Sequence, residues 1–382
     1  SRLAYRAWKE HRLASVLHPD SKPVLVAGAG SAADFLLREL ARNPAGFHVV
    51  GLLDDSRDKQ GRLVQGIPVL GPLDQAAAVA KKMEVDDIVL ALPSAAHEVR
   101  KRITQACAEA GLNVMTIPSL EDLVAGRVSV SSLRRIELDD LLGRDPVQLD
   151  DSGLHQLLTG QVVMVTGAGG SIGSELCRQI ARFAPAKLVL FEQSELALYA
   201  MEQELPQRFP EVPIVPVIGD VKNAVWVNQV MAGYCPAVVF HAAAYKHVPL
   251  MENANAWEAV RNNVLGTQVV AAAARAHGVR KFVMISTDKA VNPTNVMGAT
   301  KRLAEMACQA MQQRHADQPT GTRFVSVRFG NVLGSSGSVI PKFQKQIEAG
   351  GPVTVTHPEI TRFFMSIPEA AQLVLQAGLM GE

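Results

Sequence analysis

The chain has 382 residues, which exceeds the size of one ordinary hydrophobic core and predicts two or three domains. Its 38 lysine and arginine residues balance 37 aspartate and glutamate residues, so the net charge of +1 indicates neither a nucleic-acid partner nor an anionic membrane surface. The hydrophobic content of 48% is typical of an α/β protein, and no run approaches the ~20 apolar residues that span a bilayer. We therefore expect the chain as given to be soluble.

The four cysteines, Cys107, Cys177, Cys235 and Cys308, lie far apart in the sequence. They form no C-x-x-C pair and have no histidine at ligand spacing, so the sequence predicts neither a metal site nor a disulfide framework. We interpret them as reduced packing residues in a cytosolic setting.

Residues 1–22 are basic and polar, with some helical spacing before Pro19 and Pro23. We expect a connecting helix from an upstream segment, since the chain does not start with methionine. The end at Glu382, after a helix without a cap of its own, is expected to be trimmed in the same way.

A first αβ unit is predicted over residues 23–117. An apolar strand precedes Gly28, Gly30 and Ala33, which match the dinucleotide fingerprint G-x-G-x-x-G/A. Asp54 follows the next strand at the distance of a ribose-binding acid. Strands and helices then alternate, which predicts a parallel sheet. Two interpretations stay open: the loop holds a nucleotide, or its glycines serve only a tight turn in a packing or regulatory domain.

A second and stronger unit is predicted over residues 161–382, after a linker at 118–160 that mixes prolines, glycine and both charges. In it Gly167, Gly170 and Gly173 stand between a buried strand and a helix. Such glycines let a pyrophosphate approach the backbone at the helix N-terminus, where the N–H groups and the dipole favour negative charge.

Later strand ends in this unit also suit a dinucleotide. Glu192 ends the second strand, and a carboxylate there accepts from ribose hydroxyls and repels a 2′-phosphate, which favours NAD over NADP. Asp220 either receives the adenine amino group or is a helix N-cap. Residues 242–244 are alanines, whose small side chains leave room for a ring and a ribose. A long helical segment with Asn262 and Asn263 follows.

Residues 282–302 are the stretch around which the chain is organised. An apolar strand ends in Thr287, Asp288 and Lys289, and this edge of an open α/β sheet faces the ligand crevice. A hydrogen-bond donor, an acid and a base therefore stand in consecutive positions. The alternative is a turn or helix start in which Asp288 simply pairs with Lys289.

Six motifs follow one another over about 200 residues, namely TGAGGSIGSE, HAAAYKHVPLME, NNVLGT, STDKAVNPTNVMGATKR, VRFGNVLGSSGSVIP and TRFFMS. With them the chain resembles the extended short-chain dehydrogenase/reductase superfamily. More narrowly, it resembles the large, membrane-associated UDP-N-acetylglucosamine 4,6-dehydratases of bacterial surface-glycan pathways. The resemblance implies an α/β protein with two Rossmann-like domains. The second is a doubly wound parallel sheet with a small substrate-binding part from about residue 331.

One position departs from the wider superfamily. Its usual Y-x-x-x-K pair appears here as Met297 and Lys301, and a thioether is neither an acid nor a base. In most of the superfamily this change indicates an inactive enzyme, whereas in the large dehydratases methionine is the expected residue.

The resemblance implies oxidation of the sugar at C4 with NAD, removal of the C5 proton, loss of the C6 hydroxyl as water and return of the hydride to C6. Asp288 would then protonate the C6 hydroxyl, Lys289 would be the base at C5, and Thr287 would hydrogen-bond the C4 oxygen. Lys301 would bind the nicotinamide ribose. Whether Asp288 or a water relay accepts the C4 hydroxyl proton stays open.

The resemblance also implies three overlapping sets of site residues. The catalytic set is Thr287, Asp288, Lys289, Met297 and Lys301. The cofactor set is Gly167, Gly170, Ser171, Ile172, Gly173, Glu192, Asp220, Val221, Ala242, Ala243, Ala244, Asn263 and Lys301. The substrate set is Lys246, His247, Thr287, Asn331, Ser335, Lys342 and Arg362.

Three rival functions are considered. A UDP-sugar C4 epimerase has no use for an acid at C6, so Asp288 and Lys289 argue against it. A C5-inverting dehydratase differs only in the face that is reprotonated. A nucleotide-sensing scaffold, motivated by Met297, would bind NAD without turnover.

The partners implied are UDP-N-acetylglucosamine and a second copy of the chain, in a dimer through exposed helices of the second domain. Membrane attachment is expected only through N-terminal helices that this chain does not contain. The full-length protein is expected at the cytoplasmic face of the bacterial inner membrane.

Overall fold

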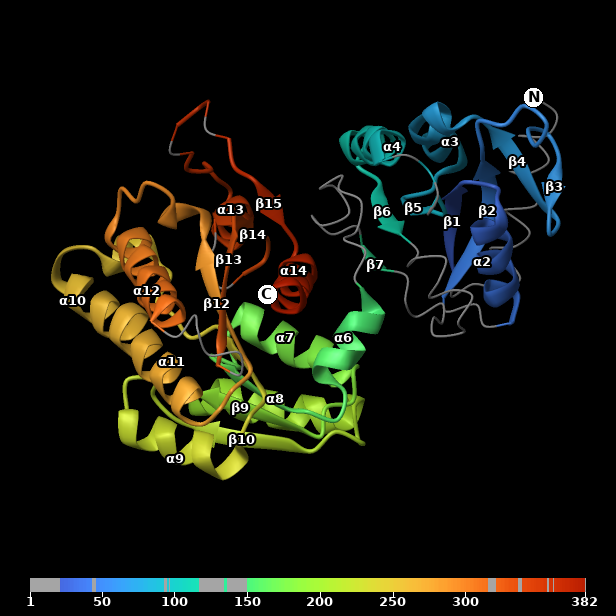
Figure 1. The fold of residues 1–382 in the computed structure, drawn as a ribbon. Coiled ribbons are helices and arrows are strands. Elements are labelled where there is room, and N and C mark those ends of the chain that lie inside the picture. The colour runs from blue at the N-terminus through green and yellow to red at the C-terminus, as the bar shows by residue number, and fades with distance from the viewer. Residues whose placement is uncertain are drawn as a thin grey trace. The chain divides into compact units, whose positions relative to one another are not determined.

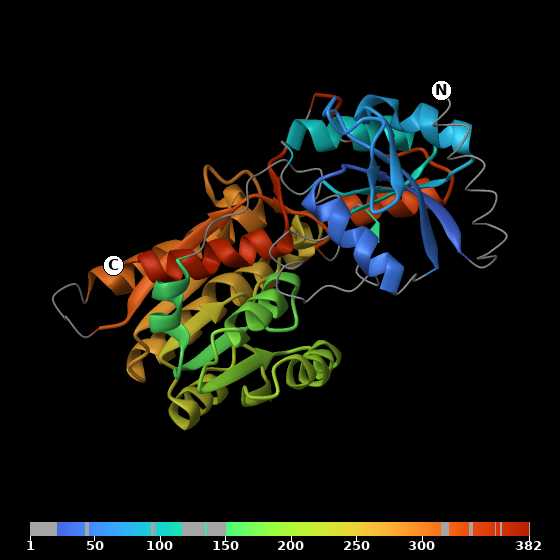
Figure 2. The same cartoon turned by 90° about the vertical axis from the view of Figure 1, so that its right-hand side faces the viewer.

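The computed structural model describes residues 21–42, 46–92, 95, 97–116, 134–135, 150–314, 321–335, 339–355, 357–359 and 361–381. The chain divides into two compact units, residues 1–145 and 146–382 (Figures 1 and 2). The predicted connector and most of the predicted linker lie outside the described residues, so the domain boundaries stay predictions.

The first unit is built on a sheet in the order β3-β4-β2-β1-β5-β6-β7. The five central strands are parallel, and the two edge strands, β3 and β7, run antiparallel to their neighbours. The strands are β1 (Lys22–Ala27), β2 (Phe47–Leu53), β3 (Leu63–Val64), β4 (Ile67–Gly71), β5 (Asp87–Leu90), β6 (Asn113–Thr116) and β7 (Arg134–Arg135). The α-helices are α2 (Ser31–Arg42), α3 (Ala76–Met83) and α4 (His97–Glu109).

Strand β1 shows why this part of the sequence is uninterruptedly apolar. Val24 and Val26 pack in one core cluster with residues of α2, whereas Leu25 and Ala27 pack in another with residues of α3 and α4. All four side chains are fully buried. A parallel strand covered on both faces needs apolar residues at every position, so the predicted Rossmann-like sheet is confirmed.

The second unit contains a six-stranded parallel sheet in the order β10-β9-β8-β11-β12-β13. This is the doubly wound order, in which the direction of winding reverses between β8 and β11, and ligands bind beyond the strand ends at that point. The predicted fold class is therefore confirmed. The strands are β8 (Val162–Thr166), β9 (Lys187–Glu192), β10 (Ile214–Ile218), β11 (Val238–His241), β12 (Lys281–Thr287) and β13 (Arg323–Phe329).

Helices cover both faces of this sheet (Figure 1). In β12, Val283 and Ile285 pack with α6, α7, α8 and α14, and Phe282 and Met284 pack with α9, α11 and α12. The helices are α6 (Asp151–Leu158), α7 (Ser171–Ala181), α8 (Glu195–Arg208), α9 (Ala224–Tyr234), α10 (Ala256–Ala259), α11 (Thr267–Ala276), α12 (Val296–Gln313), α13 (Val339–Glu348) and α14 (Ile367–Met380).

Two elements differ from their prediction. The stretch RFVSVRFGNV at residues 323–332, whose pattern predicts one strand, is broken at Gly330: β13 ends before it, and β14 (Asn331–Val332) pairs instead with β15 (Phe364–Met365). The Asn331 N–H donates to the Phe363 carbonyl at 3.1 Å, which turns the chain out of the main sheet. The long helical segment contains a π-helical stretch, Val260–Gly266, between α10 and α11. Both Asn262 and Asn263 lie in it, and such stretches often occur at functional sites.

Within the described part of the chain, no helix is long and apolar enough to cross a membrane. Among the same residues, no group of three or more histidine, cysteine or acidic side chains could hold a metal ion.

Cys107, Cys177 and Cys308 are buried, as packing residues are, whereas Cys235 is exposed, so the packing interpretation is wrong for Cys235.

Candidate active site

Two adjoining cavities lie at the C-terminal ends of the strands in the second unit. We call the smaller one, of about 260 Å³, the glycine-loop cavity, and the larger one, of about 780 Å³, the β12 cavity. Gly170, Ala242, Ala244 and Tyr245 line both of them. The two cavities therefore form one continuous site around the switch point between β8 and β11.

The glycine-loop cavity begins at the turn between β8 and α7. Gly167 has φ +67°, and a Cβ there would lie 2.7 Å from the backbone nitrogen of Ala243. A Cβ on Gly173 would overlap the carbonyl oxygen of Gly167. Gly170 is the N-cap of α7, and its position offers no side-chain cap. Only glycines fit this turn, which leaves backbone N–H groups at a helix N-terminus where an anion is favoured.

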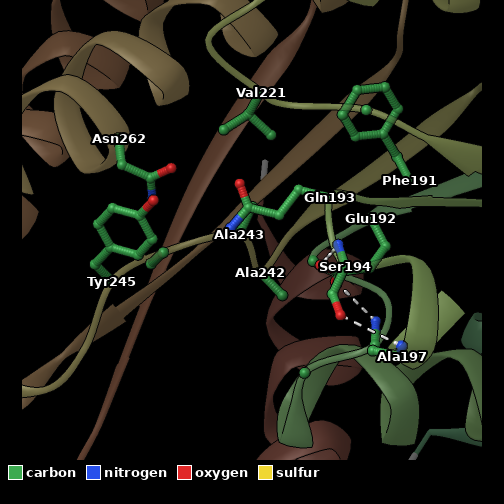
Figure 3. Close-up of a pocket in the computed structure, with 15 residues that line it drawn as sticks. Phe191, Glu192, Gln193, Ser194, Ala197, Val221, Ala242, Ala243, Tyr245 and Asn262 are labelled. Carbon is green, nitrogen blue, oxygen red and sulfur yellow. Dashed lines mark hydrogen bonds between the residues drawn. The ribbon is translucent and has the colours of Figure 1, made fainter. Parts of the chain in front are cut away.

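Glu192 holds the glycine turn from the end of β9. Its Oε2 accepts from the N–H of Gly169 at 3.0 Å, and its Oε1 accepts from the N–H of Ser194 at 3.0 Å. The side chain is buried yet lines the cavity beside Ser194 and Ala197 (Figure 3). Each carboxylate oxygen keeps a further lone pair, so a ribose hydroxyl can still donate to Glu192.

Asp220 does not line either cavity, although its neighbour Val221 lines the glycine-loop cavity. Asp220 pairs with Lys222 at 2.9 Å. Burial raises the pKa of the Asp220 carboxyl, but the hydrogen bonds and the charge of Lys222 outweigh it and lower the pKa below its usual value. The N-cap alternative for Asp220 is wrong, because Asn223 caps α9 by accepting from the N–H of Trp226.

Asn263 also lies outside both cavities, and it acts on them through Tyr245. Its Oδ1 accepts from the Tyr245 N–H at 2.8 Å, and its Nδ2 donates to the Tyr245 carbonyl at 2.9 Å. These bonds fix the turn after β11, and the Tyr245 ring then extends toward Asn262 (Figure 3). At the end of β11, before this turn, the His241 ring is hydrogen-bonded to the Thr166 and Thr267 hydroxyls. Burial, together with the Lys301 charge, lowers the pKa of His241 to about 3, so this histidine is neutral.

The end of β12 brings the predicted triplet to the larger cavity. Thr287 and Lys289 line it, whereas Asp288 does not and has a side chain that is 49% exposed. The Lys289 ammonium lies 3.0 Å from Asp288 Oδ1 and 3.1 Å from Asn331 Oδ1. Thr287 donates to the same Asp288 oxygen at 2.9 Å. The pairing that the sequence left as an alternative is thus present, and it coexists with a cavity-lining Thr287 and Lys289.

The charge state of Asp288 follows from these contacts. Burial raises the pKa of its carboxyl, but the hydrogen bonds from Lys289 and Thr287 and the Lys289 charge lower it below the usual value. Asp288 is therefore an ionised carboxylate near neutral pH. It must receive a proton before it can donate one.

Met297 and Lys301 lie one helical turn apart on α12 and both line the β12 cavity. Met297 packs with Met251 and Ala259. The Lys301 ammonium is buried and donates to the carbonyl of Ile285 at 2.8 Å. Burial lowers its pKa to about 8, against the raising effect of Glu305.

The predicted substrate residues divide in the same way. Lys246, His247, Asn331, Ser335 and Arg362 line the β12 cavity with Thr287. Partial desolvation lowers the pKa of the Lys246 ammonium. The exposed Lys342 on α13 is not among the lining residues, and residues 336–338 of the serine-rich loop lie outside the described part of the chain.

Sequence reasoning missed two kinds of lining residue. Polar ones lie within two positions of predicted residues, and this closeness in sequence was the available signal: Gln193, Ser194, Tyr245, Asn262 and Ser286. Apolar ones gave no signal, because an aliphatic or aromatic side chain in the sequence is interpreted as a core residue. Examples are Leu250, Met251, Phe329, Val339, Phe343, Val355 and Phe364.

Residues 163–382, more than half of the chain, match the family model described as polysaccharide biosynthesis protein. The chain belongs to this family. Residues 2–118 match a second model, described as a CoA-binding domain. The sequence resemblance is thereby confirmed at the level of the family, and the finer reaction class is a matter for proposal.

Relatives of known name agree with this assignment. The capsular polysaccharide biosynthesis protein CapD of Staphylococcus aureus is 46% identical over 385 residues, which cover 100% of this chain and 63% of that protein. An uncharacterised membrane protein of Methanocaldococcus jannaschii is 46% identical over 217 residues, covering 57% and 62%. A UDP-glucose 4-epimerase of Rickettsia massiliae is 36% identical over 225 residues, covering 58% and 63%. The chain thus spans about three fifths of the length of the curated relatives it matches.

One solved structure is similar in both sequence and fold. It is the X-ray structure of Pen from Bacillus thuringiensis, with 35% identity and a TM-score of 0.55 over 59% of this chain and 68% of that one.

Proposed function

We propose that this protein catalyses the NAD-dependent 4,6-dehydration of UDP-N-acetylglucosamine to a UDP-2-acetamido-2,6-dideoxy-4-keto-hexose in bacterial surface-glycan biosynthesis. The observation that carries this proposal is the triplet at the end of β12. Thr287 and Lys289 line a cavity that is continuous with a glycine-loop cavity, and Asp288 is hydrogen-bonded to both of them. A donor, a carboxylate and an amine at one edge are the groups that an elimination of water needs.

The residues of the glycine-loop cavity fit NAD. The turn excludes side chains at Gly167 and Gly173, and α7 starts at its N-cap Gly170 with the N–H groups that favour a pyrophosphate. Glu192 offers acceptors to ribose hydroxyls and would repel a 2′-phosphate. NAD supplies the hydride acceptor for C4 and the hydride donor for C6 when it is bound.

The remaining predicted cofactor residues have supporting roles in the proposal. Ser171, Ile172, Val221 and alanines 242–244 would contact NAD from the cavity walls, and Asn263 would act through Tyr245. Lys301 would donate to the nicotinamide ribose. Asp220 would need to leave Lys222 to reach adenine.

The β12 cavity suits a sugar nucleotide with a diphosphate. Lys246 and Arg362 are lining cations for the pyrophosphate, and Asn331 and Ser335 are lining polar groups. His247 is proposed as a further sugar contact. The relative named as a UDP-glucose 4-epimerase supports a UDP-sugar as the class of substrate.

The hydrogen bonds of the triplet suggest a proton path through its own residues. The ionised Asp288 can accept the C4 hydroxyl proton through Thr287, which already donates to its Oδ1. Asp288, protonated in this way, can deliver the proton to the C6 hydroxyl as it leaves. A ketone at C4 acidifies the C5 hydrogen. Once Asp288 is protonated and the Lys289 ammonium has lost its own proton to solvent, the neutral amine can remove the C5 proton as a base and return it to C5 when the hydride reaches C6. Met297 takes no part in proton transfer.

A C4 epimerase is the second candidate, because a named UDP-glucose 4-epimerase is among the relatives. An epimerase returns the hydride to C4 and leaves the mass of the sugar unchanged. A C5-inverting dehydratase would lose water and reprotonate the other face. A nucleotide-sensing scaffold would bind NAD and leave the sugar unaltered.

We also propose a homo-oligomer and a membrane location for the full-length protein. Leu265, Leu303 and Met306 on the α11–α12 side are 43%, 48% and 49% exposed, which suits a helical interface with a second copy. The relative named as a membrane protein supports a membrane location, and we propose the cytoplasmic face of the inner membrane. Light scattering of the chain and fractionation of cells with the full-length protein test these two points.

Mass spectrometry of UDP-N-acetylglucosamine after incubation with the protein, with and without added NAD, tests the reaction. We expect loss of one water without net formation of NADH. An isomerised sugar of unchanged mass would support the epimerase. Bound NAD with an unaltered sugar would support the scaffold, and NMR of the product decides the configuration at C5.

A further inference from the structure

Glu305 is a buried carboxylate on α12 that lines neither cavity and has no role in the chemistry proposed above. Its side chain is only 1% exposed. Oε1 accepts from the Ser286 hydroxyl at 2.5 Å and from Arg328 Nε at 2.8 Å. Oε2 accepts from a second Arg328 nitrogen at 2.5 Å and from Arg302 at 3.0 Å. Four charge-assisted hydrogen bonds on one buried group form a rigid junction.

The residues at this junction come from three of the segments that line the β12 cavity. Ser286 directly precedes Thr287 on β12 and is itself a lining residue of the cavity. Arg328 lies on β13, directly before the lining residues Phe329 and Gly330. Glu305 itself is one helical turn beyond Lys301 on α12. The junction therefore joins the triplet strand, the β13 end and the Lys301 helix at a single carboxylate.

Glu305 also supplies negative charge to Lys301. Glu305 and Cys308 on α12 act electrostatically on that ammonium group, and the ammonium group in turn acts on His241 on β11. Burial and the Lys301 charge lower the pKa of His241 to about 3, and burial raises the pKa of Cys308 to about 12, so both are neutral at pH 7. Arg328, on β13, keeps Glu305 ionised by its hydrogen bonds and charge, which offset the effect of burial on the pKa of Glu305. Glu305 is thus the one ionised group of the three.

We propose that Glu305 is a positioning residue that fixes the end of β12 through Ser286 and places a negative charge one helical turn from Lys301 at the cavity wall. It lines neither cavity, so it would not touch cofactor or substrate. The inference rests on the proposed function only in that Thr287 and Lys301 are the groups being positioned.

A double-mutant cycle in unfolding stability tests the charge role without cofactor or substrate. Glu305→Gln, Lys301→Met and the double variant are compared by urea unfolding at one pH below 8 and one above it, because the pKa of Lys301 is about 8. We expect the two substitutions to be coupled at the lower pH, where Lys301 is charged, and the coupling to shrink at the higher pH. Additive effects at both pH values would overturn the charge role.

Glu204 provides a matched control in the same unit. It accepts two hydrogen bonds from Arg178, at 2.7 and 2.9 Å, and one from Arg208 at 2.8 Å, which is the same arginine arrangement without a link to the cavities. Glu204→Gln should lower stability and show no coupling to Lys301→Met at either pH. Equal coupling for Glu204 and Glu305 would mean that the effect is merely structural.

NAD affinity against pH gives a second readout. Affinity should fall as Lys301 loses its proton, and Glu305→Gln should move that fall to lower pH, whereas Glu204→Gln should leave its midpoint unchanged. An unmoved midpoint in Glu305→Gln would contradict the proposal. A wild-type protein that binds no NAD at any pH would contradict the proposed function instead, and the stability cycle would still decide the role of Glu305.

Ser286→Ala isolates the positional role, and it keeps the claim testable if Glu305→Gln does not fold. It removes one hydrogen bond of the junction and leaves the charges of Glu305 and Arg328 in place. We expect kcat to fall, by up to about 100-fold if Thr287 shifts by an ångström, with the pH midpoint of NAD affinity unchanged. A wild-type kcat in this variant would overturn the positional role.

Discussion

In both units a carboxylate at the end of the second strand accepts hydrogen bonds from the backbone of the glycine turn. In the first unit Asp54 accepts from the Ala29 N–H at 2.8 Å and from the Ser56 N–H at 2.9 Å. In the second, Glu192 accepts from the N–H groups of Gly169 and Ser194. In each case a carboxylate at the end of the second strand accepts hydrogen bonds from the glycine turn and from the residue two positions beyond itself.

The units differ in what surrounds that carboxylate. Lys59 also donates to Asp54 at 3.1 Å, so this carboxylate is already paired with a cation. A Cβ on Gly28 would lie 2.5 Å from the carbonyl of Ala91, so its glycine is explained by the close approach of the next strand end. The strand ends of the second unit bear the triplet, Tyr245 and Asn331 instead. The comparison teaches that the fingerprint fixes a turn, whereas the chemistry depends on the later strands.

In each unit a lysine pairs with a carboxylate, Lys59 with Asp54 and Lys289 with Asp288. Removal of Lys289 is expected to have the largest effect on turnover. Lys289→Ala should lower turnover by about 100- to 10,000-fold, because the base at C5 is lost, while NAD stays bound. Product formation is followed by mass spectrometry. Lys59→Ala removes the corresponding cation of the first unit and should leave turnover unchanged. Near-normal turnover in Lys289→Ala would refute its role.

Asp288→Asn should lower turnover by a factor similar to that of Lys289→Ala, again with NAD still bound. The amide keeps the shape of the side chain and can neither accept the C4 proton nor deliver one to C6. Single-turnover measurements should show that C4 oxidation is also impaired, since Thr287 loses its acceptor carboxylate. Full C4 oxidation in this variant would favour the water relay.

A glycine pair sharpens the contrast between the two turns. Gly173→Ala should destabilise the second unit by about 1–3 kcal/mol, because its Cβ would overlap the Gly167 carbonyl. Gly30→Ala should change stability by less than about 0.5 kcal/mol, because no atom of the described residues lies within 4 Å of a Cβ at Gly30. Urea unfolding measures both, and comparable losses would remove the distinction.

Substitution of the two carboxylates that hold the glycine turns, Glu192 and Asp54, should affect NAD affinity differently. Glu192→Gln is expected to weaken NAD about tenfold, as for a lost hydrogen bond to a charged group, and to reduce the preference over NADP. Asp54→Asn should leave both affinities unchanged. Isothermal titration calorimetry of the two variants gives the answer, and an effect of Asp54→Asn would place a nucleotide in the first unit.

The smallest effect is an acid-side loss of stability. Burial raises the pKa of Asp54, but hydrogen bonds from Ser56, Ala29 and Lys59 lower it below the usual value near 3.8. Its stabilisation is therefore present above that pH and is lost as the pH falls through the folded-state pKa. Asp54→Asn should therefore reduce the fall in the free energy of unfolding between pH 5 and pH 2, which urea unfolding measures. Asp288→Asn should do so less, because that side chain is 49% exposed and screened by water.

The sequence by itself determined the local elements. Continuous apolar runs predicted the strands, because a parallel strand that helices cover on both faces is apolar at every position. The glycines at 167, 170 and 173 predicted the turn before α7. The triplet at 287–289 was predictable because a parallel strand presents its end to the crevice. Where the local pattern was ambiguous, as at Asp220, the sequence left two interpretations and the structure removed one.

Only the tertiary structure decided which distant residues meet. The register of β12 on β13 pairs Thr287 with Phe329 and so brings Lys289 to Asn331, 42 positions later in the chain. The packing of α12 against these strands gives Glu305 its contacts with Ser286 and Arg328. No periodicity encodes such contacts, because they depend on strand order and on helix placement over the sheet. The apolar lining from Phe343, Val355 and Phe364 was hidden for the same reason, since a residue that lines a cavity and one that fills a core have the same local pattern.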